Sequence, residues 1–405
     1  MSLTGISRDI QSIQEKHRRV PEMVKGIKVP YYRRGEMAIP AFKMKSGGNP
    51  EIEGRETSLK LMKKVVDLPV DFFFYDLEDA SPDHNEYKAF ARKFVVDVLN
   101  SMNFGDRVVA FRPNNIRTEY FEQDLIEVVS RAGDKLNAMV IPKTEHAEEI
   151  HDIIDIVNRI QRASGHTNVI SFEVLIESPT AFLEAEKIAA YDQVSALIFG
   201  AWDFARTTGA MVEPKSWLHD QLFARQRLPI VASAYGKDAV DAVTGILPIR
   251  PKCPGGIAEE EYNNVLAQDP GSLDKKKFGV EVIRQLEARK KALELAERDA
   301  LDARRCGYAA KWILHPDQIA PIQRAWTPTR ERALAALQLA TAYTKAAKTG
   351  SGAEVDGNRL ADKAVVGTDW WIVLAALRGN VLHDEDIQAT GLTLKQLGRT
   401  VVTHD

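Results

Sequence analysis

Short runs of apolar, β-favouring residues alternate along most of the chain with longer amphipathic stretches. Eight such runs occur, at residues 37–42, 71–76, 107–113, 137–143, 169–177, 194–200, 241–247 and 311–316. The stretches between them place apolar residues at helical spacing, as in "QDLIEVVSRAGDKL" and "TAFLEAEKIAAY". Strands alternating with helices in this way predict a parallel sheet that is covered on both faces.

Eight strand–helix units favour a closed (β/α)8 barrel, whose usual size is about 250 residues plus insertions. A doubly wound open sheet is the main alternative. No run is followed by a glycine-rich dinucleotide-binding loop, which removes the best support for that alternative. We therefore predict an α/β fold, a (β/α)8 TIM barrel with a C-terminal helical lid domain.

Two regions fall outside the repeat: an insertion within the barrel domain and a C-terminal domain. Residues 1–326 are predicted to form the catalytic barrel, and its Pro/Gly-rich insertion at about 245–280 leads into a heavily charged helix. A helix of that kind is usually a solvated face or a partner contact. Residues 327–405 are predicted to form the helical lid domain, with residues 349–362 as a loop before its last long helix.

Composition restricts the partners. The formal net charge of −3 argues against nucleic acid as the main partner, because nucleic-acid-binding domains usually carry a basic excess. Cys253 and Cys306 provide neither a disulfide framework nor a metal-ligand cluster. Residues 1–20 lack the apolar core of a signal peptide, and no apolar run is long enough to span a bilayer. We expect a cytoplasmic protein without a membrane partner.

Polar residues follow most of the predicted strands. The carboxyl ends of parallel barrel strands meet at one rim, where the active sites of such barrels lie. The residues at these ends are Glu78, Asp79, Arg112, Asn114, Lys143, Glu145, Glu177, Asp203 and His315. Each has an ordinary structural explanation by itself, such as helix capping or ion pairing. Their accumulation at one rim favours an active site.

The acids at this rim suit a particular kind of site. Glu177 and Asp203, from adjacent strands and without a cysteine or histidine cluster nearby, form a hard oxygen-ligand pair for Mg²⁺ or Mn²⁺. Glu78 and Asp79 are placed to hold coordinated waters. Arg112 provides a permanent cation for developing negative charge. The combination fits enolate chemistry, the aldol or Claisen cleavage of a hydroxy acid.

Seven blocks of the sequence, taken in order, resemble one known family. They are "YDLEDA", "FRPN", "MVIPKTE", "VLIESPTAFLEAEKIA", "LIFGAWDFA", "CGYAAKWILHPDQI" and "GAEVDGNRLADKAVV". Together they resemble the citrate lyase β-subunit-like family, which includes malyl-CoA, β-methylmalyl-CoA and citramalyl-CoA lyases. The resemblance covers residues 70–375 approximately and is strongest with the longer malyl-CoA/β-methylmalyl-CoA lyases.

The resemblance implies a (β/α)8 barrel with a C-terminal lid that uses Mg²⁺ to cleave a 3-hydroxyacyl-CoA into an acyl-CoA and a 2-oxo acid such as glyoxylate. It also implies a homo-oligomer, a trimer or hexamer. Coenzyme A enters as part of the substrate.

The resemblance assigns roles residue by residue. Glu177 and Asp203 match the metal carboxylates, and Arg112 matches the arginine that steadies the thioester enolate. Glu78 and Asp79 match the acids beside the metal, and Glu78 is included with the catalytic residues. Asp362 matches the acid/base that reaches a neighbouring subunit's site, so active sites would be shared between subunits. The remaining residues expected around the metal or substrate are Asn114, Lys143, Gly200, Ala201 and Trp202.

The chain departs from the family pattern in places. The family's N-terminal Ser-Leu-Pro-Gly block is barely recognisable in "AIPAFKMKSGGNPE", which leaves the coenzyme A contacts near residues 40–50 open. Ser178 replaces the usual threonine after the metal glutamate. The insertion at 245–280 is longer than expected for the family and lies on the catalytic side of the seventh strand.

Three other functions stay open: a thioesterase for the same hydroxyacyl-CoA, a CoA-independent hydroxy-acid aldolase, and a catalytically silent assembly or binding subunit. The silent subunit is disfavoured because the key positions retain chemically competent residues. Products from a panel of malyl-, methylmalyl- and citramalyl-CoA would separate all of these functions.

Overall fold

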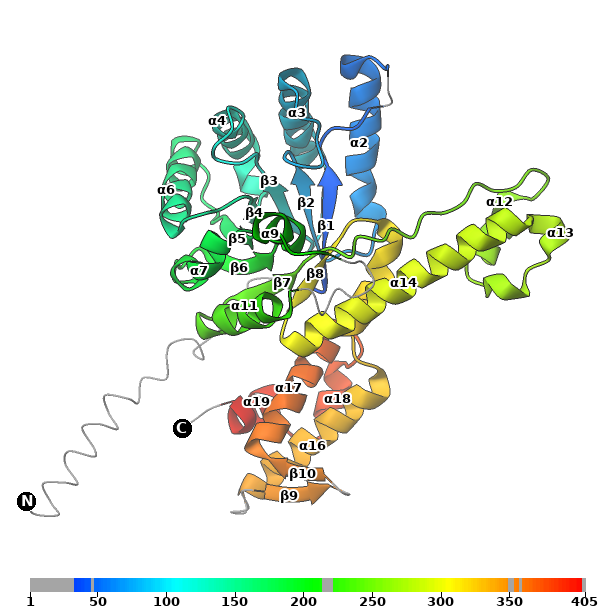
Figure 1. The fold of residues 1–405 in the computed structure, drawn as a ribbon. Coiled ribbons are helices and arrows are strands. Elements are labelled where there is room, and N and C mark those ends of the chain that lie inside the picture. Colours follow the sequence, from blue (N-terminus) through cyan, green and yellow to red (C-terminus); the bar gives the residue numbers. More distant parts are fainter. Residues whose placement is uncertain (1–32, 45–46, 213–220, 349–352, 357–358, 403–405) are drawn as a thin grey trace, which may run out of the picture. The chain divides into compact units, whose positions relative to one another are not determined.

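The computed structural model describes residues 33–44, 47–212, 221–348, 353–356 and 359–402. Parallel strands in this part of the chain pair in sequence order, and β8 pairs with β1 to close a barrel (Figure 1). The strands are β1 (Gly35–Pro40), β2 (Phe72–Asp76), β3 (Val108–Arg112), β4 (Ala138–Ile141), β5 (Ser171–Ile176), β6 (Val194–Phe199), β7 (Asp238–Asp241) and β8 (Ala310–Ile313). The predicted (β/α)8 TIM barrel is confirmed.

Helices surround the barrel and bury one face each. In α6 (Ala147–Ala163), the apolar Ile150, Ile153 and Val157 recur at helical spacing and are buried, as an amphipathic outer helix requires. Further helices around the barrel are α2 (Arg55–Lys63), α3 (Asn85–Ser101), α4 (Phe121–Asp124), α5 (Ser130–Ala132), α7 (Pro179–Leu183), α8 (Ala185–Ala189), α9 (Ala201–Thr208) and α11 (Leu222–Ala234). None of the helices in the described part of the chain combines the length and apolarity needed to cross a membrane.

Apolar side chains fill the middle of the barrel. Successive residues of a strand point to opposite faces. On β2, Phe72 and Phe74 therefore belong to the inner cluster, whereas the ring of Phe73 packs against Phe104, 5.3 Å away between centroids. The buried inner cluster consists of Phe72, Phe74, Val108, Ala110, Ala138, Val140, Leu175, Ala196, Ile198, Val240, Ala310 and Trp312. The barrel interior is thus a packed apolar core, and the polar groups of the interior lie at its ends.

A buried charged cluster closes the interior at the amino ends of the strands. Nη1 of Arg33 donates to Oε1 of Glu36 and of Glu173, at 2.6 Å each. Its Nε lies 3.2 Å from Oδ2 of Asp238. Nε1 of Trp312 donates to Glu36 at 3.0 Å. One guanidinium therefore ties acids from β1, β5 and β7 together at the end of the barrel opposite the candidate site.

The seventh strand differs from the run predicted at 241–247. β7 ends at Asp241, and the chain then leaves the barrel toward the insertion. Nε2 of Gln318 donates to the carbonyl oxygens of Thr244 and Ile246, at 3.2 and 3.3 Å, so a side chain replaces the hydrogen bonds of a strand neighbour. The predicted bounds of this strand are wrong because the apolar residues after Asp241 pack without extending the sheet.

The insertion has a small apolar core of its own. α12 (Glu259–Val265), α13 (Lys275–Phe278) and the amino-terminal part of α14 (Val280–Cys306) lie side by side (Figure 1). They bury a shared cluster of Val265, Leu273, Phe278, Ile283 and Leu286. The later part of α14 buries alanines instead. The charged helix, α14, was expected to be solvated or to contact a partner. One of its sides is instead packed within the protein.

The chain divides into two compact units, Met1–Ile322 and Gln323–Asp405, with α15 (Ile319–Trp326) spanning the division. The second unit contains α16 (Arg330–Lys348), α17 (Lys363–Arg378), α18 (Asp384–Ala389) and α19 (Leu394–Val402). Its core joins α16 to α17 through residues such as Leu337, Ala340, Trp370 and Val373.

The predicted loop before the last long helix is partly a β-hairpin. β9 (Ala353–Asp356) pairs antiparallel with β10 (Arg359–Asp362), with Val355 opposite Leu360. The prediction of a loop throughout 349–362 is wrong over these strands. Its Gly and Asp residues are typical of a tight hairpin connection as well as of an irregular loop.

A second buried charge network joins the barrel wall to its outer helices. Nζ of Lys311 lies 2.7 Å from Asp241 and 2.8 Å from Asp299 of α14. The guanidinium of Arg225 on α11 contacts the same two acids at 2.7 and 2.8 Å. Burial alone would raise the pKa of the Asp299 carboxyl, but Lys311 and Arg225 outweigh it and hold that pKa below its usual range. Two cations thus offset two anions out of contact with water.

We expect Lys311→Met to lower the free energy of unfolding by about 3–5 kcal/mol, because it removes one of the two cations that offset the buried carboxylates of Asp241 and Asp299. Urea unfolding at pH 7 measures this loss. Arg284→Met on α14 is the matched control, since Arg284 pairs with Glu281 at the surface, where water screens the pair and its loss should change stability little. Equal losses in the two variants would contradict the stabilising role of the network.

Candidate active site

Arg112 closes β3 and is held rigidly by the first acid of the "YDLEDA" block. Its Nε and Nη2 donate to the two carboxylate oxygens of Asp76 on β2, at 2.8 and 2.5 Å. The guanidinium also lies over the rings of Phe74 and Trp312, at 5.8 and 5.4 Å from their centroids. Only 6% of Arg112 is exposed. The charge of Asp76 outweighs burial and raises the pKa of Arg112, so the guanidinium is a fixed cation.

Asp76 also shapes the turn that follows β2. Its carboxylate accepts hydrogen bonds from the backbone N–H groups of Glu78 and Ala80, at 2.9 and 3.1 Å. An acid is needed at the end of this apolar strand because one carboxylate orients Arg112 and fixes the loop that carries Glu78. The sequence analysis did not assign this role to Asp76.

Glu78 is a buried acid beside the free edge of Arg112. Its Oε2 lies 3.1 Å from Nη1 of Arg112 without the alignment of a hydrogen bond, and no other described residue donates to this oxygen. Burial raises the pKa of Glu78 to about 8, against the opposing charge of Arg112. Glu78 is therefore largely protonated at neutral pH and able to donate a proton.

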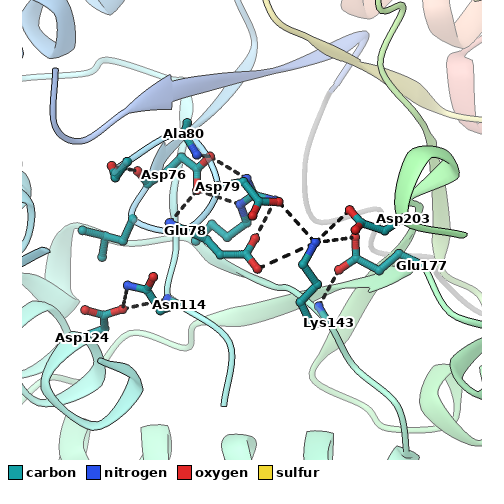
Figure 2. A network of polar contacts seen from close by, with 12 residues as sticks. Asp76, Glu78, Asp79, Ala80, Asn114, Asp124, Lys143, Glu177 and Asp203 are labelled. Atoms are coloured by element: carbon teal, nitrogen blue, oxygen red, sulfur yellow. Dashed lines mark hydrogen bonds and ion pairs between the residues drawn. The ribbon is translucent and has the colours of Figure 1, made fainter. Parts of the chain in front are cut away.

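The ammonium of Lys143 lies among four carboxylates (Figure 2). Its Nζ is 2.8 Å from Asp203, 3.2 Å from Asp79, 3.7 Å from Glu177 and 4.0 Å from Glu78. Burial alone would lower the pKa of Lys143, but these acids outweigh it and raise that pKa. The acids predicted from separate strands thus meet around one cation.

The backbone of Lys143 is also fixed. Its φ is +50°, a left-handed conformation that non-glycine residues rarely adopt. Its N–H donates to Oε1 of Glu177 at 2.5 Å, and its carbonyl oxygen accepts from Nη1 of Arg117 at 2.9 Å. Such a conformation costs roughly 1–3 kcal/mol and persists where the surrounding structure imposes it. Arg117, which the sequence analysis missed, is part of that structure.

Gly200 leaves the space that Glu177 occupies. A Cβ at Gly200 would lie 2.3 Å from Cβ and 2.9 Å from Oε2 of Glu177. The helix α9 starts directly afterwards, at Ala201, and places Asp203 in its first turn. Trp202 is 42% exposed, and its ring lies where a Cβ at Gly245 would be. The "GAWD" sequence therefore brings Asp203 next to Glu177 without a clash.

The donor set fits a hard divalent cation. Glu177 and Asp203 both face the one ammonium, which already stands where a positive charge is favoured. Burial raises the pKa of Glu177 to about 7, whereas the hydrogen bond from Lys143 and the charge of Arg206 overcome burial and lower that of Asp203. No group of three or more Asp, Glu, His or Cys side chains suited to a metal occurs within the described residues. Two carboxylates suffice for Mg²⁺, which usually keeps several waters.

Two predicted site residues make other contacts. The backbone N–H and Nδ2 of Asn114 both donate to Oδ2 of Asp124, at 2.7 Å each, so Asn114 is turned away from the Lys143 cluster (Figure 2). Asp362 lies in the second unit and caps α17, where its Oδ1 accepts from the N–H of Val365 at 2.8 Å. Its role in catalysis stays a prediction.

The comparisons with known proteins point to the same family. Residues 56–247 match the family model described as HpcH/HpaI aldolase/citrate lyase. An L-malyl-CoA/beta-methylmalyl-CoA lyase of Cereibacter sphaeroides is 28% identical over 318 residues, which cover 76% of this chain and 87% of the relative.

Solved structures share the fold. A citrate lyase from Burkholderia xenovorans LB400 has a TM-score of 0.63 at 18% identity, covering 88% of this chain and 95% of its own. The protein CitE from Mycobacterium tuberculosis, in complex with magnesium, acetoacetate and coenzyme A, has a TM-score of 0.55 at 18% identity and covers 86% of this chain and 99% of its own.

The raised pKa of Glu78 predicts a pH dependence of stability. Between the unfolded value near 4.5 and the folded value of about 8, the folded state binds a proton that the unfolded state releases, so stability falls as pH rises. Glu78→Gln removes this titration. Urea unfolding measures the stability of the variant minus that of the native protein. This difference should be higher at pH 8 than at pH 5 by at least about 1.4 kcal/mol, the equivalent of one pKa unit. A pH-independent difference would contradict the buried, protonated Glu78.

Proposed function

The chain belongs to the HpcH/HpaI aldolase/citrate lyase family, and we propose that it is a Mg²⁺-dependent lyase acting on the carbon–carbon bond of a 3-hydroxyacyl-CoA. Its substrate would be malyl-CoA, methylmalyl-CoA or citramalyl-CoA. The products would be an acyl-CoA and a 2-oxo acid such as glyoxylate. The relative named a malyl-CoA/methylmalyl-CoA lyase supports the reaction class.

The observation that carries the proposal is the pairing of Glu177 with Asp203 around one cation, beside the fixed guanidinium of Arg112. Glu177 and Asp203 would hold Mg²⁺, with Mn²⁺ as a substitute. A bound divalent ion would supply positive charge beside the hydroxy-acid half of the substrate and favour loss of its hydroxyl proton.

The residues of the chain then have distinct tasks. A base, for which we propose Asp362, takes the hydroxyl proton, and the O–H electron pair becomes part of the new carbonyl group of the 2-oxo acid. The carbon–carbon bond breaks, and its electron pair passes to the acyl-CoA enolate. Arg112 supplies preorganised positive charge to that enolate. Glu78, protonated at neutral pH, is a proton source close to the same guanidinium.

We expect Glu177→Gln and Asp203→Asn to weaken Mg²⁺ binding by at least about tenfold, because each removes a ligand charge and little volume. Lyase turnover should fall with it. Calorimetric titration with Mg²⁺ and product analysis from the panel of acyl-CoA substrates measure both effects. Glu186→Gln, the same chemical change at an exposed acid, is the control. Full turnover after chelation of divalent ions would overturn the metal requirement.

We further propose a cytoplasmic homo-oligomer in which the second unit is a lid that delivers Asp362 to a neighbouring subunit's barrel. The motif match of "VDGNRLAD" supports this role. Asp362 also caps α17, which would explain an acid at this position without a catalytic role. Asparagine caps helices about as well as aspartate. Asp362→Asn therefore removes the acid while keeping the cap.

Asp362→Asn and Arg112→Ala should each be inactive, and mixed oligomers of the two should recover activity. Random one-to-one mixing gives intact pairs at about a quarter of the sites when each site combines two subunits. Activity after subunit exchange, with mixing verified by affinity tags, measures this recovery. Mixing two Asp362→Asn preparations is the control. No recovery in verified mixed oligomers would rule out the shared site.

A further inference from the structure

Lys143 adopts an unfavourable backbone conformation, and this conformation does not by itself favour a lysine at this position. With φ at +50°, glycine would adopt this geometry at a lower cost. The N–H that Glu177 accepts would be present with any residue except proline. The special property of a lysine at this position is therefore its side chain.

The side chain places one positive charge at the point where the site carboxylates converge. Nζ lies 2.8 Å from Oδ2 of Asp203 and 3.7 Å from Oε2 of Glu177. These are the two acids to which the proposed function assigns the divalent ion. An ammonium at this distance and a divalent ion beside the same oxygens repel each other, since both are cations in a partly buried site.

We propose, resting on the metal site of the proposed function, that Lys143 is the internal counter-cation of that site and competes with the divalent ion for Glu177 and Asp203. Without metal, the ammonium neutralises the carboxylates and keeps the barrel mouth stable. When metal binds, the side chain of Lys143 moves away from them while its backbone stays in place. Lys143 therefore sets how tightly the free enzyme holds metal.

The backbone contacts make this exchange local. The N–H of Lys143 is fixed by Glu177, and its carbonyl oxygen is fixed by Arg117. One oxygen of Glu177 is therefore held by the main chain of residue 143, whatever cation faces the other oxygen. Rotation of the lysine side chain is enough to transfer the site from one cation to the other.

A matched cation on the same acid is available as a control. Arg206 pairs with Oδ1 of Asp203 at 2.6 Å, but its side chain is 71% exposed. Exposed ion pairs contribute little because water screens them. Removal of Arg206 therefore tests whether loss of any nearby positive charge is sufficient, whereas removal of Lys143 tests competition within the site.

The experiment measures Mn²⁺ binding to the full-length protein by the loss of free-ion EPR signal. Lys143→Met should bind Mn²⁺ at least about tenfold more tightly than the native protein, whereas Arg206→Met should change affinity by less than about threefold. Lys143→Gly, which suits the positive φ and keeps the N–H, should match Lys143→Met. Lys143→Arg, which keeps the charge, should remain as weak as the native protein.

Thermal unfolding provides a second readout. Metal-free Lys143→Met should melt below the native protein, and saturating Mn²⁺ should raise its melting temperature by more than it raises the native value. Native Mn²⁺ binding that depends on Glu177, together with unchanged affinity in both Lys143→Met and Lys143→Gly, would overturn the counter-cation role alone. Absence of Glu177-dependent Mn²⁺ binding in the native protein and in every variant would overturn the proposed metal site as well.

Discussion

Charge neutrality at the mouth of a closed barrel is the constraint on which the candidate site depends. The strands converge there, so acids far apart in the sequence come within a few ångströms of one cation, and two of them, Glu78 and Glu177, are buried where water screens them poorly. Glu78, Asp79, Glu177 and Asp203 surround a single ammonium, that of Lys143. A cation at its centre stabilises this arrangement, and under the proposed function a divalent ion would take that place.

The same constraint is met differently elsewhere in the barrel. Lys311 and Arg225 face Asp241 and Asp299 in the wall, and these four groups make close contacts with each other. Paired in this way, they hold α14 against β7 and β8. Breaking such a buried set is costly, so it is suited to fixing structure. At the mouth, by contrast, Lys143 is shared among several acids, Asp203 also pairs with the exposed Arg206, and Glu78 lies against Arg112. This looser pairing leaves carboxylate capacity for a divalent ion.

The sequence was sufficient for the architecture because strand and helix periodicities are local signals. The same signals predicted that Glu177 and Asp203 follow adjacent strands, and in the structure Glu177 comes directly after β5 and Asp203 lies in the first turn of α9, after β6. It misplaced β7, since the apolar residues after Asp241 do not extend the sheet, and the carbonyl oxygens of Thr244 and Ile246 accept from Gln318, far along the chain. It also could not assign Asp76, whose role depends on Arg112 of the neighbouring strand, or the left-handed backbone of Lys143, which Arg117 and Glu177 impose.

The acids of the site differ in pKa, and this difference suits them to different tasks. Burial raises the pKa of Glu78 to about 8, whereas the hydrogen bond from Lys143 helps to hold the pKa of Asp203 below its usual range. A metal ligand must be ionised, and a proton donor must not be. Asp203 therefore has the environment of a ligand, and Glu78 that of a proton donor beside Arg112. Glu177, with its pKa raised to about 7, is intermediate. A divalent ion would complete its ionisation, which couples the charge state of Glu177 to the cation that occupies the site.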